Sequence, residues 1–200
     1  MDKLKNIAIL ICLFLATASA SAQFRYGFRF GASIADAKMK DAPGYSLVNK
    51  GGFEGGIAFE YQHPSSGFAA DIAILYNRYN VRLKENGGEA GSFGRNYIEV
   101  PLHAKYKFWL PAVHNLAAPL IYTGPSFLMR LDDNHGRAVS TSDIQPGWDL
   151  GIGIDVVNFI QITGGYRFGL GNSVKAFSGC PDATIHSNGW NIAATLLFDF

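Results

Sequence analysis

The sequence has little cysteine, no excess of one charge and no long hydrophobic run apart from its start. Of its two cysteines, Cys12 lies in a segment that we expect to be removed, so Cys180 has no internal partner for a disulfide. The chain has 17 basic and 16 acidic residues, a net charge of +1. No basic surplus indicates nucleic acid as a partner, and no acidic surplus indicates a cationic one.

The N-terminal segment has the pattern of a secretory signal peptide. It begins with two lysines, continues with an apolar run over 7–16 and ends in small residues, with an Ala-x-Ala site at Ala22. Such a run is too short to span a bilayer. We therefore expect a signal peptide over 1–22 and one mature domain over 23–200. Cleavage takes the basic count from 17 to 15 and the acidic count from 16 to 15.

Beyond the signal, no apolar run approaches the roughly 20 residues of a membrane helix. Instead, apolar and polar residues alternate with a period of two, which predicts strands. Eight segments are expected to be strands: 24–34, 52–62, 67–82, 96–109, 118–130, 147–157, 159–170 and 189–200. The alternation blurs after Arg78, which indicates a bulge or an extension past the bilayer. For the segment 118–130 we cannot assign which residues point inward, because residues 120–128 do not alternate well between apolar and polar.

The connections between these segments differ in length in a regular order. Long ones, rich in Gly, Asn, Asp and Ser, span 35–51, 83–95, 131–146 and 171–188. Those between them are shorter. Outer-membrane barrels have long loops outside and short turns at the periplasm. This order predicts an outer-membrane location with both mature termini in the periplasm.

Two chemically different faces follow from the alternation. The polar face combines small residues with charges of both signs, as the filled interior of a narrow barrel requires. We expect an interior charge network of Arg25, Arg29, Glu54, Glu60, Asp71, Glu99, His103, Lys105, Lys107, Asp149, Asp155 and Arg167. The apolar face is predicted to face lipid through Phe28, Phe30, Ile57, Phe59, Ile72, Ile74, Ile98, Val100, Leu102, Leu150, Ile152, Ile154, Ile160, Ile162, Ile192 and Leu196.

The predicted fold is therefore all-β: an eight-stranded antiparallel up-and-down transmembrane β-barrel, preceded by a cleaved signal peptide. Aromatic residues near the strand ends are typical of the two girdles of such barrels. The alternative is a soluble, lipocalin-like ligand-binding barrel, which alternates equally well but turns its apolar face inward.

Several residues suggest chemistry but lack a complete site. Glu99, His103 and Lys105 share one strand face, where an ion-pair network is a simpler interpretation than a proton relay. His186 and Ser187 lack the third group of a catalytic constellation, so a lipid-modifying enzyme is a secondary alternative. The stretch 132–136 resembles part of a calcium loop without its closing Glu. We expect no catalytic residues, no cofactor and no metal site.

Short motifs resemble those of the PorT-like outer-membrane β-barrel family. They are Tyr97-Ile98-Glu99-Val100-Pro101-Leu102, Lys105-Tyr106-Lys107-Phe108, Tyr122-Thr123-Gly124-Pro125-Ser126, Phe28-Arg29-Phe30-Gly31-Ala32 and Leu196-Leu197-Phe198-Asp199-Phe200. The resemblance implies an eight-stranded barrel that the outer-membrane barrel assembly machinery inserts, with Phe200 as the assembly signal. It also implies a bulge or kink at Pro101, since a proline removes a donor from the ladder.

From these features we expect a non-enzymatic integral outer-membrane protein with a side-chain-filled interior. Its outward loops would serve envelope integrity, adhesion or assistance to protein secretion. The expected partners are outer-membrane lipid, the assembly machinery, and secretion or surface partners of the loops, but no nucleic acid.

Overall fold

The computed structural model describes residues 23–36, 39–40, 45–64, 66–85, 88–108, 116–131, 139–141, 144–170, 174–177, 184–185 and 188–199. The predicted signal peptide, Cys180, His186, Ser187, the stretch 132–136 and Phe200 lie outside these residues. Among the residues that are described, no helix is long and apolar enough to cross a membrane.

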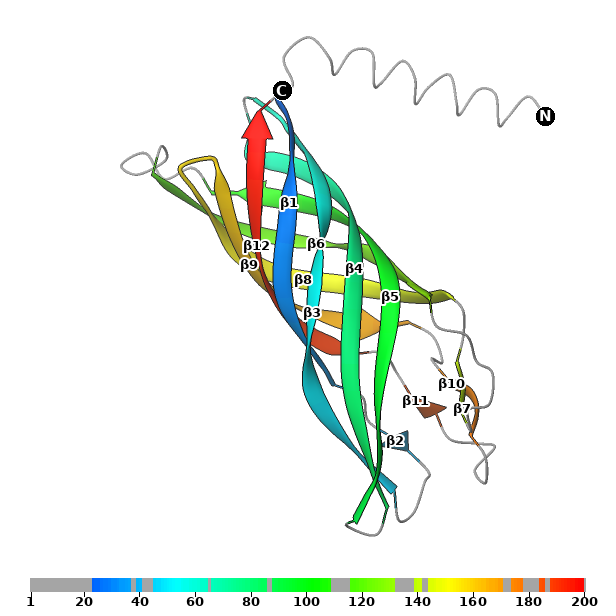
Figure 1. Cartoon of the computed structure of the whole chain (residues 1–200). Helices are drawn as coiled ribbons and strands as arrows, with labels where there is room; N and C mark the ends of the chain where they lie inside the picture. The colour runs from blue at the N-terminus through cyan, green and yellow to red at the C-terminus, as the bar shows by residue number, and fades with distance from the viewer. Residues whose placement is uncertain are drawn as a thin grey trace, which may run out of the picture.

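Eight strands form one closed antiparallel barrel (Figure 1). They are β1 (Gln23–Ala35), β3 (Tyr45–Gln62), β4 (Phe68–Glu85), β5 (Gly88–Lys107), β6 (Ala117–Arg130), β8 (Ile144–Val156), β9 (Ile160–Gly169) and β12 (Gly189–Asp199). Neighbours in the chain are neighbours in the barrel, and β1 closes the ring by pairing with both β3 and β12. The predicted fold class is confirmed.

Four short strands lie at the end of the barrel where the long connections gather. There β2 (Met39–Lys40) pairs with β11 (Thr184–Ile185), and β7 (Val139–Thr141) pairs with β10 (Val174–Phe177). The opposite end holds the start of β1, the end of β12 and the short connections β3–β4, β5–β6 and β8–β9. We call these the loop end and the turn end.

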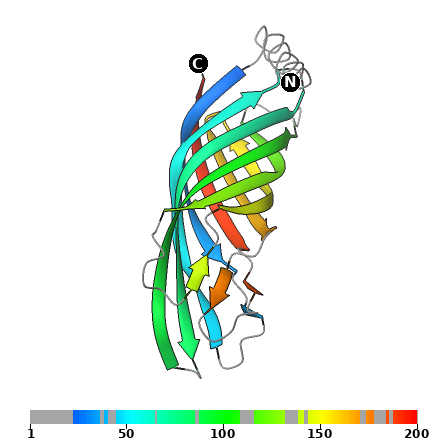
Figure 2. The same ribbon diagram turned by 90° about the vertical axis from the view of Figure 1, so that its right-hand side faces the viewer.

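Three strands reach past the rest of the barrel at the loop end. Residues 45–50 of β3 pair with 80–85 of β4, and 81–85 of β4 pair with 88–93 of β5. This three-stranded arm stands beyond the mouth of the barrel (Figures 1 and 2). The expectation of a long loop over 83–95 is therefore wrong, because β4 continues to Glu85 and β5 already begins at Gly88. Polar, glycine-rich composition does not separate a loop from paired strands here.

The strand β4 continues past Arg78, and a bulge lies beside this point on the neighbouring strand β3. Lys50 pairs with Asn80 but Phe53 pairs with Arg78, so Gly51 and Gly52 together oppose Tyr79. This is a β-bulge in β3, and bulges increase the local twist of a sheet. Where the alternation blurs, the structure thus has a bulge on the partner strand and a continuation of β4 into the arm.

Pro101 lies in the middle of β5, where we expected a bulge or a kink, and the register shows no bulge. The register of β5 against β6 is the same at Pro101–Ser126 and at Ala104–Thr123. On its other side, β5 pairs with β4 at Glu99 and Leu102 but not at the two residues between them. The missing N–H of proline thus falls in a gap of the ladder, which accommodates it without an extra residue.

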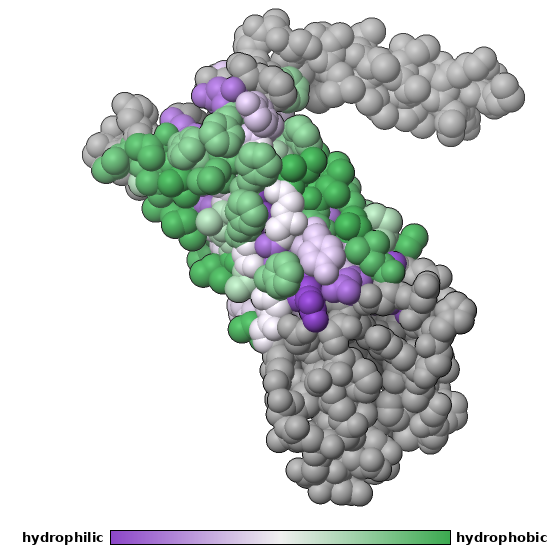
Figure 3. Space-filling model, viewed as in Figure 1, coloured by the Kyte–Doolittle hydropathy of each residue, from purple (hydrophilic) through white to green (hydrophobic). Residues whose placement is uncertain are grey.

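The apolar face of the barrel points outward (Figure 3). All sixteen residues expected to face lipid have outward-pointing side chains; Ile152 is 68 % exposed, whereas Ile98, Val100, Ile160 and Leu196 are half-buried among their neighbours. In β6, whose inward face the sequence did not assign, buried and less buried side chains alternate along the whole strand. Leu120, Tyr122 and Leu128 point inward. The phase of β6 could not be predicted from hydropathy because apolar side chains occupy both of its faces.

Candidate functional site: the polar interior of the barrel

All twelve residues of the expected charge network point into the barrel. They come from six strands, β1, β3, β4, β5, β8 and β9, and strict alternation along each strand puts them on the inner face. Eleven are buried as whole residues, and the side chain of Asp71 is 6 % exposed. Buried charges are stable only when they are paired and hydrogen-bonded.

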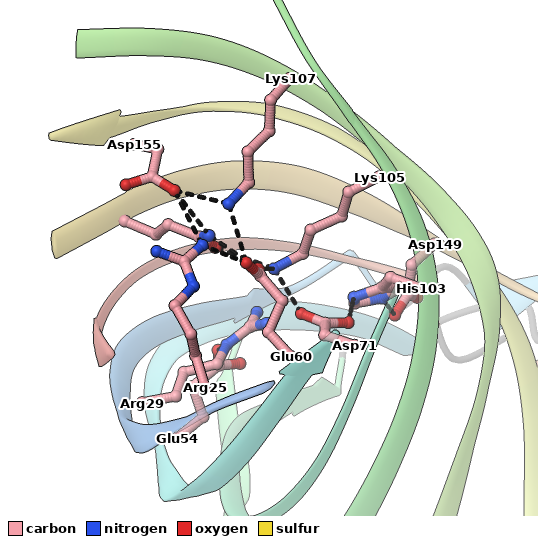
Figure 4. Close-up of polar contacts among 11 residues, drawn as sticks. Arg25, Arg29, Glu54, Glu60, Asp71, His103, Lys105, Lys107, Asp149 and Asp155 are labelled. Atoms are coloured by element: carbon pink, nitrogen blue, oxygen red, sulfur yellow. Dashed lines mark hydrogen bonds and ion pairs between the residues drawn. The ribbon is translucent and has the colours of Figure 1, made fainter. Parts of the chain in front are cut away.

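Glu60 is the centre of the network near the turn end (Figure 4). Its carboxylate accepts hydrogen bonds from Lys105 Nζ and Lys107 Nζ, each at 2.8 Å, and also pairs with Arg25. Gln161 Nε2 donates a fourth bond to it at 2.7 Å. Three cationic groups from two strands therefore converge on one carboxylate.

Asp155 shares these donors from the other side. Its Oδ2 accepts from Lys107 Nζ at 2.6 Å, from Arg25 Nη2 at 3.1 Å and from Gln161 Nε2 at 3.2 Å. Arg25 and Lys107 thus each lie between two carboxylates. The cluster joins β1, β3, β5, β8 and β9 across the barrel, so it ties together strands that are not neighbours in the sheet.

His103 connects this cluster to a second one. Its Nδ1 lies 3.1 Å from Asp71 Oδ1, and its Nε2 lies 3.1 Å from Asp149 Oδ2. Asp71 in turn lies 2.5 Å from Lys105 Nζ. The imidazole is therefore held between carboxylates of β4 and β8, with one ring nitrogen against each.

The second cluster lies nearer the loop end. Arg167 Nε donates to Asp149 Oδ1 at 3.0 Å, and the same guanidinium pairs with Glu99. Asn77 Nδ2 donates to Glu99 Oε2 at 2.7 Å. Beside it, Arg29 Nε donates to Glu54 Oε1 at 3.1 Å. Each cation here has at least one carboxylate partner.

The charges of this interior nearly balance. Arg25, Arg29, Lys105, Lys107 and Arg167 are five cations, and Glu54, Glu60, Asp71, Glu99, Asp149 and Asp155 are six carboxylates. A protonated His103 makes the two numbers equal. A neutral, internally paired set is the arrangement with the least cost for charges removed from water.

Uncharged side chains fill the space that remains. Tyr122 crosses the interior so closely that a Cβ on Gly165 would lie 2.1 Å from its Oη, and one on Gly151 would lie 2.3 Å from its ring. Leu75, Leu120 and Gln161 are fully buried. Eight strands enclose an interior just wide enough for side chains, and here side chains occupy it along its described length.

Sequence reasoning missed the uncharged members of the network. Gln161, Asn77 and Ser126 bond directly to its charged groups, and the hydroxyl of Tyr79 accepts hydrogen bonds from Asn77 and Arg167. Gln161 shares strand parity with Arg167, and Asn77 and Tyr79 share it with Asp71. Parity would therefore have identified these three, whereas Ser126 lies on β6, whose phase the sequence left open.

Among the described residues, the imidazole of His103 is enclosed by other side chains. His103 has a side chain only 2 % exposed, and carboxylates occupy both of its nitrogens. The described residues contain no group of three or more His, Cys, Asp or Glu side chains arranged to hold a metal ion. What the arrangement does chemically is neutralise and fill the barrel.

Comparison with known proteins agrees with this architecture. The structure resembles the crystal structure of the outer membrane protein OprG from Pseudomonas aeruginosa, with a TM-score of 0.62 and 11 % identity over 89 % of this chain and 96 % of that one. Neisserial surface protein A gives a TM-score of 0.49 and 18 % identity over 86 % and 97 % of the two chains. At such identities the likeness to OprG shows the fold alone.

None of the curated proteins matches the chain in a sequence comparison. A family model described as "outer membrane protein beta-barrel domain" matches residues 17–175, which is most of the chain. With the closed barrel and its outward apolar face, this match places the protein in the outer membrane. The chain belongs to the outer membrane protein β-barrel domain family.

Proposed function

We propose that this protein is a non-enzymatic, non-conducting outer-membrane barrel whose role lies in what it presents at its loop end. The observation that carries the proposal is the interior: a neutral network of paired charges, packed with uncharged side chains, closes the barrel. A closed barrel cannot serve as a pore, so its functional surface lies at its ends.

The arm and the loop-end connections are the natural functional surface. The arm of β3, β4 and β5 extends the wall well beyond the closed part of the barrel (Figure 2). Bacterial outer-membrane barrels place long connections outside and short turns in the periplasm. Both mature termini would then be periplasmic, and the arm would stand at the cell surface.

The role of that surface is adhesion, envelope integrity or assistance to protein secretion. The last of these follows from the resemblance to PorT-like proteins. The same resemblance makes the barrel assembly machinery a partner, with Phe200 as the residue that it recognises. Outer-membrane lipid surrounds the wall, and secretion or surface partners would contact the arm and loops.

The two alternatives fare differently. A soluble ligand-binding barrel needs an apolar interior and a polar exterior, and this barrel has the reverse. A lipid-modifying enzyme needs a nucleophile and a base that lipid can reach, whereas His103 is enclosed by Asp71 and Asp149. The enzyme alternative is tested by comparing the lipid A of a deletion strain with that of the parent strain. A changed pattern of acyl chains in the deletion strain would argue for an enzyme.

Conductance measurements test the proposal. We expect purified protein in planar lipid bilayers to give no stable single-channel current, while a sample kept folded still migrates differently before and after boiling. Reproducible ion-selective openings from the folded protein would show that the interior is not closed and would overturn the proposed role.

Orientation has its own test. His63, in the β3–β4 turn, is replaced by cysteine in a Cys180→Ser background, and intact cells are treated with a membrane-impermeant thiol reagent. Labelling is expected only after the outer membrane is permeabilised. Labelling on intact cells would place the turn end outside.

A further inference from the structure

One charged residue of the barrel wall lies outside the paired charge network of the interior. Among the described strand residues, Arg78 of β4 is the one with a charged side chain on the outward face. Every cation of the interior is paired with a carboxylate, but no described carboxylate pairs with Arg78. An outward arginine in a mostly apolar wall is available to bind an anion outside the protein.

Its position along the strand is that of a bilayer interface. Arg78 lies opposite Phe53 of β3 in the register, one outward position beyond Tyr76, and the rings of Phe53 and Tyr76 lie 5.8 Å apart. Such aromatic rings mark the level of the lipid headgroups. Arginine costs about 2–4 kcal/mol at the bilayer midplane but only about 0–1 kcal/mol near the interface, so this place tolerates it.

The surroundings of Arg78 are polar and uncrowded. Asn96 of β5 lies opposite it in the register, and the hydroxyl of Tyr76 donates to Asn96 Oδ1 at 2.7 Å. On the other side the β-bulge brings Gly51 and Gly52 next to it, and Gly51 has open space where a Cβ would stand. In Figure 3 a small hydrophilic patch interrupts the apolar surface over β3 and β4.

We infer that Arg78 binds the phosphate group of an outer-leaflet lipid, with Asn96 at its side and the glycine bulge as a recess for the headgroup. A guanidinium presents paired N–H donors that match two oxygens of a phosphate. Of the anions that could meet an arginine at this level, a lipid phosphate is the one that the membrane itself supplies. The inference rests on the proposed orientation, with the loop end outside.

The test is a titration of the folded, detergent-solubilised protein with lipopolysaccharide. Intact and enzymatically dephosphorylated samples are compared, and bound lipid is counted by native mass spectrometry. For the wild type, we expect dephosphorylation to weaken binding about tenfold, the effect of one charge-assisted contact. Arg78→Gln should lose this preference, and Arg78→Lys should keep part of it because it keeps the charge without the paired donors.

Asp199→Asn, at the opposite end of the barrel, is the matched control and should retain the full preference. The shift on boiling shows that each variant is folded. An Arg78→Gln protein that still prefers the phosphorylated lipid tenfold would overturn the inference. So would inorganic phosphate that displaces the lipid at equal concentration, since free phosphate would then be the ligand.

The two experiments together distinguish a wrong orientation from a wrong lipid contact. If the His63→Cys protein is labelled on intact cells while Arg78→Gln still abolishes the preference for phosphate, the contact exists but the leaflet is wrong. If the labelling pattern is as expected and the preference survives in Arg78→Gln, the lipid contact is wrong while the orientation holds.

Discussion

Lys105 of β5 donates a 2.8 Å hydrogen bond from Nζ to Glu60 Oε2 of β3, across an interior that both strands help to enclose. Between these strands lies β4, so the bond does not follow the sheet but crosses it. Contacts of this kind hold the cross-section of the barrel in one shape.

Removing the charge of Glu60 should therefore be costly. Glu60→Gln leaves Arg25, Lys105 and Lys107 around a neutral amide. Breaking a buried ion pair from one side costs about 3–5 kcal/mol, and we expect a loss of this size in urea unfolding of the protein in lipid vesicles. Asp199→Asn, an exposed carboxylate at the end of β12, should change the stability by less than about 0.5 kcal/mol. Equal effects of the two changes would argue against the network.

Leu102→Arg tests the assignment of the faces. Leu102 points outward in the middle of β5, at 38 % exposure. An arginine on the lipid face near the midplane costs about 2–4 kcal/mol, against about 0–1 kcal/mol near an interface. We expect much less Leu102→Arg protein in the outer membrane, whereas Phe108→Arg, just beyond the end of the same strand, should assemble nearly normally. Immunoblots of membrane fractions compare them, and normal levels of Leu102→Arg would contradict the assignment.

Two adjacent glycines of β9 should respond in opposite ways to alanine. A Cβ on Gly165 would lie 2.1 Å from Tyr122 Oη inside the barrel, so Gly165→Ala should cost about 1–3 kcal/mol through overpacking. A Cβ on Gly164 points outward and meets only Asn191 O, at 3.8 Å. Gly164→Ala should therefore be neutral or stabilise by about 0.4–1 kcal/mol. The free energy of unfolding of each variant, measured at equilibrium, tests this prediction. A Gly165→Ala protein as stable as the wild type would show that Tyr122 does not fill this space.

The β8–β9 turn contains a strained residue that can be relieved. Val157 and Asn158 have the left-handed φ values of 49° and 55°, and they are the central residues of a turn in which Phe159 N donates to Val156 O at 3.1 Å. A β-branched residue tolerates such a φ poorly, whereas asparagine tolerates it well. Val157→Asn should stabilise the barrel by about 1 kcal/mol, and the reverse change at the next position, Asn158→Val, should destabilise it. Thermal unfolding followed by the shift on boiling measures both. A loss of stability in Val157→Asn would mean that the side chain of Val157 has a packing role.

The sequence was informative wherever one face of a strand is apolar and the other is not. In β1 and β5 each side chain alternates in kind, so Phe28 and Arg29, or Leu102 and His103, could be assigned to opposite faces without coordinates. The interior of such a barrel must pair its charges, which made the twelve charged residues recognisable as one group. In β6 the rule failed, because Leu120 and Leu128 fill the interior as apolar residues.

Local composition was a poor guide at the loop end. The residues of 83–95 are mostly small, polar or charged, and they were predicted to form a loop, yet most of them continue β4 and β5 into the arm. Strand pairing there follows from the neighbouring strand and not from an alternation that the sequence shows. The bulge at Gly51 and Gly52 belongs to the same region, and only the pairing of β3 with β4 reveals it.

The sequence alone therefore determined the fold class, the number of barrel strands and the inner or outer face of most residues. A period of two divides each strand into two faces, and the small residues and charges of both signs on the polar face indicate that this face is the interior. The tertiary structure decided which charges meet. His103 lies between Asp71 and Asp149, and Glu60 gathers cations from β1 and β5, because the stagger of the closed ring sets which rows of side chains share a level. That stagger is a property of the whole barrel and of no single strand.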